Sequence, residues 1–177
     1  MKRPFKNILF VQVLLLAFIG CDNAKRPIEK VTTNDDYYEK CRKLVLSENI
    51  IGQEYFFKLT KKEIDEFKLT YLGSIKTVKG DTLKFLNAVI FLGQYEDSKR
   101  ANGAVFIYDN QNKKIGAYYV GGASGVPQKT EGPNLVFSYN DESCNQTTAI
   151  NFKDSIPQQI FINCTEKGGD FYSFSKE

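Results

Sequence analysis

Apolar and polar residues alternate with a period of two over most of the chain beyond residue 66. Alternation of this kind is typical of β-strands that are buried on one face. Clusters of Gly, Pro, Asn and Asp separate the alternating runs, as is usual at turns. The pattern predicts eight short strands, at residues 67–78, 82–92, 103–109, 114–122, 134–139, 147–152, 158–164 and 170–175.

The connections between these strands are too short to hold long helices, which argues against a parallel α/β sheet. Lys79, Gly80 and Asp81 form one tight turn, and residues 110–113 connect a second hairpin. The ten Tyr and fourteen Phe residues also favour strands. The predicted fold is mainly β (α+β at the margin), an antiparallel meander that forms a barrel, a curved sheet or a sandwich.

Two stretches before the strands carry helical signals instead. In residues 34–49, Asn34 can cap a helix, and apolar residues including Cys41 recur at helical spacing. Further along, Thr60 and Glu63 have the spacing of a capping box, in which each side chain bonds the backbone N–H of the other residue. The sequence therefore predicts one or two short N-terminal helices, the first with Cys41 on its apolar face and the second beginning at Thr60.

The first 21 residues follow a third pattern. Lys2, Arg3 and Lys6 form a positive head, and the 13 residues at 8–20 are apolar except for Gln12. An apolar core of this length is shorter than the roughly 20 residues of a transmembrane helix. A charged head followed by a short apolar core is typical of a secretion signal.

The apolar core ends in Phe18-Ile19-Gly20-Cys21. This ending resembles the lipobox of bacterial lipoproteins, although Phe18 stands where that family usually has Leu. The resemblance implies that the signal peptidase cuts between Gly20 and Cys21 and that Cys21 carries a diacylglyceryl group. Two acyl chains hold a protein stably on a membrane, whereas a single chain is marginal. An uncleaved anchor helix and an ordinary secreted protein are the alternatives.

These signals predict the organisation of the whole chain. Residues 1–20 are the expected signal peptide, residues 21–33 the lipidated cysteine with a flexible tether, and residues 34–177 a single β-rich domain. The protein is expected in the bacterial cell envelope, attached to a membrane by the lipid on Cys21. Whether that membrane is the inner or the outer one, and whether the domain faces the periplasm or the surface, stays open.

The signal peptide also accounts for the net charge of +3, which comes from 24 basic and 21 acidic residues. Its residues include three of the basic residues and none of the acidic ones, which leaves 21 of each in the mature chain. A basic excess that is removed with the signal peptide gives no reason to expect nucleic acid as a partner.

The chain contains no histidine, which excludes histidine-activated nucleophiles and histidine-ligated zinc. The segment GGASGV has Val126 where a nucleophile elbow needs glycine, and DNQNKK has Lys113 where a calcium loop needs an oxygen ligand. We therefore expect no catalytic residue, no metal site and no cofactor. A pair of carboxylates, as in glycoside hydrolases, is the remaining catalytic alternative.

Three cysteines remain after Cys21, namely Cys41, Cys144 and Cys164. In an exported protein two of them are expected to form a disulfide. Cys144 and Cys164 lie at the ends of neighbouring predicted strands, so this pair is predicted, with Cys41 as a buried thiol. Bridges from Cys41 to Cys144 or to Cys164 remain open.

The longest irregular segment, residues 121–133, follows two tyrosines. A loop of this length is uncommon in a compact domain unless it is functional or disordered. One tyrosine of the pair is expected to face inward, because side chains alternate along a strand. The candidate contact residues are Tyr118, Tyr119, Gly121, Gly122, Ser124 and Gly125.

The sequence thus predicts a non-enzymatic, lipid-anchored envelope protein whose β-rich domain binds a partner, expected to be a protein. An inhibitor or immunity-type lipoprotein directed against lysozyme or a toxin is an alternative, by analogy of size and architecture. A carboxylate-based hydrolase of cell-wall polysaccharide is a further alternative. Thr82 and Ser155 stand in Asp-Thr-Leu and Asp-Ser-Ile triplets, which resemble the O-glycosylation acceptor of exported Bacteroidota proteins.

Overall fold

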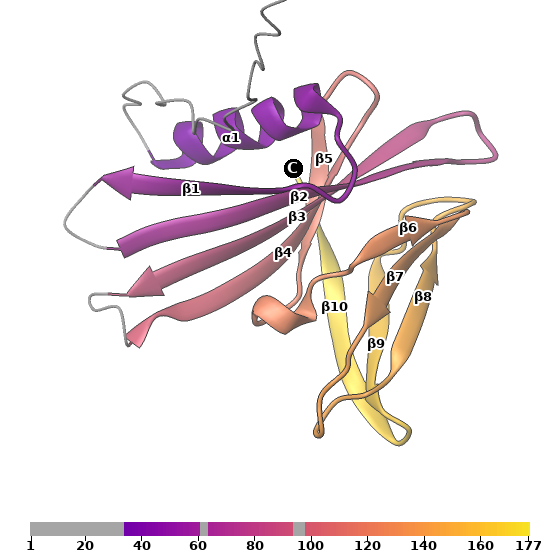
Figure 1. The fold of residues 1–177 in the computed structure, drawn as a ribbon. Helices are drawn as coiled ribbons and strands as arrows, with labels where there is room; N and C mark the ends of the chain where they lie inside the picture. The colour runs from indigo at the N-terminus through magenta and orange to yellow at the C-terminus, as the bar shows by residue number, and fades with distance from the viewer. Residues whose placement is uncertain (1–33, 61–63, 94–97) are drawn as a thin grey trace, which may run out of the picture. The chain divides into compact units, whose positions relative to one another are not determined.

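The computed structural model describes residues 34–60, 64–93 and 98–177 (Figure 1). All of them belong to one compact unit, residues 31–177. In this described part the chain forms one α-helix, one short 3₁₀-helix and ten strands in two sheets. None of the described helices is long and apolar enough to cross a membrane. The predicted signal peptide, lipobox and tether lie outside the described residues.

Both sheets are antiparallel, and they do not close into a barrel. In spatial order the larger sheet contains β1 (Glu54–Thr60), β2 (Ile64–Lys76), β3 (Thr82–Gly93), β4 (Arg100–Tyr108), β5 (Lys114–Tyr119), β10 (Gly168–Lys176) and β9 (Gln159–Thr165). The smaller sheet contains β6 (Lys129–Glu131), β7 (Asn134–Ser138) and β8 (Thr147–Asn151). The predicted mainly β, antiparallel meander is therefore confirmed, and the barrel is not formed.

Eight of the ten described strands, β2–β5 and β7–β10, are those that the alternation predicts. The two additional strands lie at sheet edges. β1 is the outer strand of the larger sheet, beside β2, and β6 is the outer strand of the smaller sheet, beside β7.

The second predicted helix is not formed. Thr60 and Ile64 are cross-strand partners at the end of the β1–β2 hairpin, so the capping-box spacing falls where two paired strands are joined. The rings of Phe57 and Phe67 stack across this hairpin with centroids 5.0 Å apart. A capping side chain contributes about 1 kcal/mol, which is less than two buried aromatic rings and a strand pairing contribute together.

The helix α1 (Asn34–Glu48) covers one face of the larger sheet (Figure 1). Tyr37, Cys41 and Val45 are spaced by four residues and are buried against that sheet. The helix ends before Asn49, whose left-handed φ of 54° is a conformation that asparagine tolerates. Cys41 is thus a buried thiol on the apolar face of the helix, and burial raises its pKa to about 11.

A polar cluster ties α1 to β4. Glu39 accepts hydrogen bonds from Arg42 Nε at 3.0 Å and from the Tyr108 hydroxyl at 3.0 Å. The Arg42 guanidinium lies 4.3 Å from the centroid of the Phe106 ring, an arrangement that stabilises a desolvated cation. Burial raises the pKa of Tyr108, so its hydroxyl stays protonated and remains a donor. Each charge at this helix–sheet contact therefore has a partner, as buried charges require.

The smaller sheet covers the opposite face of the larger sheet. Phe85 of β3 and Tyr118 of β5 lie edge-to-face against Phe152, which follows β8, with centroids 4.8 and 6.4 Å away. All three side chains are fully buried. The Tyr118 hydroxyl donates a hydrogen bond to the Pro157 carbonyl, which satisfies its only polar group in this core.

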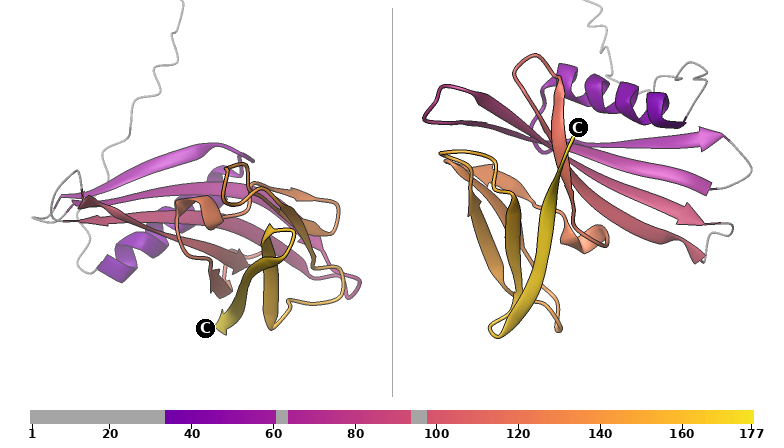
Figure 2. Two further views of the ribbon diagram at one scale, coloured as in Figure 1. Left: turned by 90° about the horizontal axis from the view of Figure 1, so that it is seen from below. Right: turned by 180° about the vertical axis from the view of Figure 1, so that it is seen from behind.

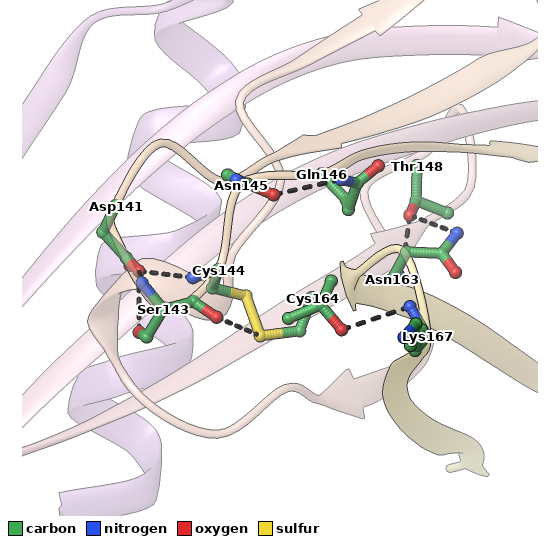
Figure 3. The surroundings of a disulfide bond; sticks show 10 residues. Asp141, Ser143, Cys144, Asn145, Gln146, Thr148, Asn163, Cys164 and Lys167 are labelled. Carbon is green, nitrogen blue, oxygen red and sulfur yellow. Dashed lines mark hydrogen bonds between the residues drawn. A yellow bond between two sulfur atoms is a disulfide. The ribbon is translucent and has the colours of Figure 1, made fainter.

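The predicted disulfide between Cys144 and Cys164 is confirmed (Figure 3). It joins the connection between β7 and β8 to β9, at the edge of the larger sheet. Beside it the Asn145 N–H donates to the Cys164 carbonyl at 2.9 Å, and the Asp141 carboxylate accepts from the Cys144 N–H. Cys41 is the free cysteine of the described residues, so the alternative bridges from Cys41 are not formed.

Candidate functional site

The two tyrosines predicted as contact residues lie on opposite faces of β5. Tyr118 has no exposed surface and belongs to the core beneath the smaller sheet. Tyr119 exposes 63% of its surface. Tyr118 is therefore removed from the candidate contact surface, whereas Tyr119 remains in it.

Residues 121–133 are more regular than the sequence suggests, because they contain the 3₁₀-helix η2 (Ala123–Gly125) and β6. Gly125 is buried, and a Cβ atom there would lie 2.1 Å from the Val120 carbonyl oxygen. Only glycine fits at this close approach of two backbone segments. Because Gly125 is buried there, it is not available for contact with a partner. The exposed candidates are Gly121, Gly122 and Ser124.

Next to Tyr119 the structure assembles a surface that the sequence analysis did not identify. Residues that pair directly across strands share one face of a sheet, as do residues two apart in one strand. Phe171 of β10 pairs with Phe161 of β9. Ser175 of β10 pairs with Ala117, which is two residues from Tyr119 on β5. Six exposed residues therefore lie on one face, which we call the aromatic face: Tyr119, Gln159, Phe161, Phe171, Ser173 and Ser175.

The aromatic face has a large ring area and no charge. Phe171 exposes 65% of its surface and Phe161 exposes 36%. The two rings lie 4.7 Å apart between centroids and form one continuous apolar surface. The other three members are Ser and Gln, and none of the six members is charged. Aromatic residues are enriched and charged residues depleted at the core of protein interfaces, so this composition is typical of a binding surface.

The aromatic face is uncovered because α1 does not reach it. The helix shares its core with residues of β1–β5, and the last of them along the chain is Ala117. The smaller sheet packs on the opposite face of the larger sheet, together with Tyr118 and Tyr172. In the view from behind, β10 is drawn in front of the smaller sheet with no other described element over it (Figure 2).

One signal in the sequence could have identified this face. Ile160, Phe161 and Ile162 are consecutive apolar residues, as are Phe171 and Tyr172. In a strand, consecutive apolar residues make both faces apolar. One apolar face of such a strand packs against the core. The other apolar face stays exposed and is available to a partner.

The described residues contain no group of three His, Cys, Asp or Glu side chains placed to hold a metal ion. Comparisons of the chain with protein-family models, with curated proteins and with solved structures find no match. The function is therefore inferred from the chemistry of the chain's own surface.

Proposed function

We propose that this protein is a non-catalytic binding protein of the bacterial cell envelope, anchored to a membrane by a lipid on Cys21, and that its aromatic face holds a protein partner. The observation that carries the proposal is the exposure of three aromatic rings on one uncharged sheet face. Large exposed apolar surfaces on soluble domains are commonly interaction sites.

The rings of the aromatic face are suited to the centre of an interface. Burying a Phe side chain contributes about 1.5–3 kcal/mol relative to leaving it in water, and a few aromatic residues supply most of the binding energy in many interfaces. A charged group buried against this face would find no opposite charge, which is costly. The expected partner is therefore a protein surface with apolar side chains at its centre and uncharged polar groups around them.

The proposed anchor rests on the resemblance of residues 18–21 to a lipobox. A tether of the 13 residues at 21–33 would span about 20 Å as a flexible coil. A domain held at this distance samples partners close to the same membrane at high effective concentration. Membrane attachment would thus raise the occupancy of the aromatic face without any additional contact.

Replacing Cys21 by alanine is expected to move the protein from the membrane fraction to the soluble fraction, because alanine has no thiol to accept the diacylglyceryl group. Cell fractionation combined with palmitate labelling measures this. Cys41→Ala is the matched control, since it also removes a thiol, but one that is buried in the domain. Membrane retention and labelling of Cys21→Ala at the level of the unmodified protein would contradict the lipid anchor.

Replacing Phe171 by serine is expected to weaken binding of the partner at least tenfold. Removing an aromatic ring from the centre of an interface commonly costs about 2 kcal/mol or more, and 1.4 kcal/mol corresponds to a factor of ten. The measurement is capture from envelope extract with the full chain as bait, identification by mass spectrometry, and titration with the purified partner.

Phe56→Ser is the matched control for this experiment. Phe56 lies on β1 and exposes 65% of its surface, as Phe171 does. A partner that binds both variants as it binds the unmodified protein contradicts a role for the aromatic face. A partner lost equally with either variant indicates non-specific adhesion to exposed rings, which also contradicts the proposal.

A further inference from the structure

A cavity of about 450 Å³ lies where four segments distant in sequence meet. They are residues 77–83 between β2 and β3, residues 109–115 at the β4–β5 turn, residues 154–158 before β9, and Phe174 with Lys176 on β10. The volume falls within the range of about 300–1,000 Å³ that is usual for ligand cavities. The cavity is separate from the aromatic face, because Phe174 and Phe171 are three residues apart and so lie on opposite faces of β10.

Backbone hydrogen bonds hold the walls of this cavity in place. The Val78 N–H donates to the Lys153 carbonyl at 2.8 Å, which ties the β2–β3 turn to the segment before β9. The Phe174 N–H donates to the Gln158 carbonyl at 2.8 Å, which ties β10 to the same segment. A cavity whose walls are already held in place loses little conformational freedom when a ligand binds.

The lining combines apolar side chains with polar groups that donate and accept hydrogen bonds. Ile115, Ile156 and Phe174 are half-buried and supply the apolar surface. Thr82 and Ser155, the residues of the two Asp-Ser/Thr-aliphatic triplets, contribute hydroxyl groups. Thr77, three aspartates, two lysines and two side-chain amides complete the polar lining, so charges of both signs are present.

We propose that this cavity binds a neutral saccharide. A pyranose ring has faces of C–H groups and an edge of hydroxyl groups that each donate and accept. The apolar side chains of Ile156 and Phe174 match a C–H face, and the carboxylates of the lining accept strong hydrogen bonds from hydroxyl groups.

Anionic and purely apolar ligands fit this lining less well. Phosphate and other anions meet three carboxylates and two ammonium groups, so the charges of the lining give them no net attraction. The same count of charges does not disfavour a cation, so a polyamine is included among the probes below. A purely apolar ligand would remove water from the carboxylates without replacing its hydrogen bonds.

Two of the three carboxylates in the lining face water and can accept hydrogen bonds from a saccharide. Asp81 and Asp154 are exposed to water. Asp109 accepts hydrogen bonds from the Gln111 and Lys113 N–H groups at 2.8 and 2.9 Å, which shape its own turn.

Titration of the ¹⁵N-labelled full chain with glucose, galactose, mannose, N-acetylglucosamine and chitobiose tests the proposal. At least one of these sugars is expected to shift the backbone amide signals of Gly80, Asn110 and Ser155 at the cavity. The amide signal of Ser173 on the aromatic face is expected to stay unchanged, since it lies outside the cavity.

Replacing Asp81 and Asp154 together by asparagine is expected to weaken sugar binding at least tenfold, because two charged acceptors are lost. Glu142→Gln is the matched control, since it removes an exposed carboxylate in the connection between β7 and β8. An unchanged amide spectrum outside the cavity shows that each variant is folded.

Inorganic phosphate and spermidine serve as probes for charged ligands. Shifts of the cavity signals by either of them, with no shift by any sugar, would overturn the saccharide assignment. The absence of shifts with all probes, or sugar binding by the aspartate variant as tight as that of the unmodified chain, would overturn it as well. Capture of a protein partner through Phe171 does not depend on these outcomes, so failure of one proposal is distinguishable from failure of the other.

Discussion

Replacing Phe152 by alanine is expected to lower the free energy of unfolding by about 3–5 kcal/mol, the usual cost of deleting a buried phenylalanine ring. Phe152 has no exposed surface. Its ring contacts Phe85 and Tyr118 edge-to-face, and both of these side chains come from the larger sheet. Alanine would leave a cavity between the two sheets, and the neighbouring rings are themselves held in dense packing and would fill it only in part.

Equilibrium urea unfolding measures this loss, with Phe56→Ala as the control. Phe56 is 65% exposed, and substitutions at such positions usually change stability by no more than about 0.5 kcal/mol. A Phe152→Ala midpoint that shifts no further than that of Phe56→Ala would show that the smaller sheet does not pack on the larger one through this ring.

Removing the disulfide by replacing Cys144 and Cys164 together with serine is expected to lower the free energy of unfolding by about 3 kcal/mol. The bridge spans 20 residues, and closing a loop of about this length restricts the unfolded chain by that amount. The backbone hydrogen bond from Asn145 to Cys164 remains in the variant, so the native fold should persist with reduced stability.

The same result should follow from reduction of the unmodified protein, because both treatments remove the same covalent link. The two urea midpoints are therefore expected to coincide. Peptide mapping of the unreduced protein should find Cys144 joined to Cys164, with Cys41 alkylated only after unfolding. A cross-linked peptide that contains Cys41, or a midpoint that does not respond to reducing agent, would contradict the assignment.

The elements that the sequence predicts correctly are those whose signal is local. The strands β2–β5 and β7–β10 alternate between their two faces, and a period of two is readable within each strand. The helix α1 repeats its buried residues Tyr37, Cys41 and Val45 every four positions. The disulfide pair is predicted because Cys144 and Cys164 lie 20 residues apart at the ends of predicted strands, and the short connections between them keep the two cysteines close.

The elements that the sequence does not predict depend on distant partners. In β1 the consecutive residues Phe56 and Phe57 interrupt the alternation, and pairing with β2 decides the conformation in place of the capping-box signal. β6 has three residues, and it is held by β7 and by the Thr130 hydroxyl, which donates to the Leu72 carbonyl of β2 at 2.9 Å. A strand this short has no stability of its own and forms only where a partner receives it.

The same distinction applies to the candidate sites. Alternation alone puts Tyr118 and Tyr119 on opposite faces of β5, but only the packing of α1 and of the smaller sheet decides which tyrosine is buried and which is exposed. The cavity likewise depends on the backbone hydrogen bond from Val78 to Lys153, which brings residues 77–83 beside residues 154–158. Contacts between distant segments leave no local periodicity, because each segment is compatible with many partners until the whole chain packs. Local patterns therefore specify the strands, the helix and the disulfide, and tertiary packing selects the side chains that remain in water to bind.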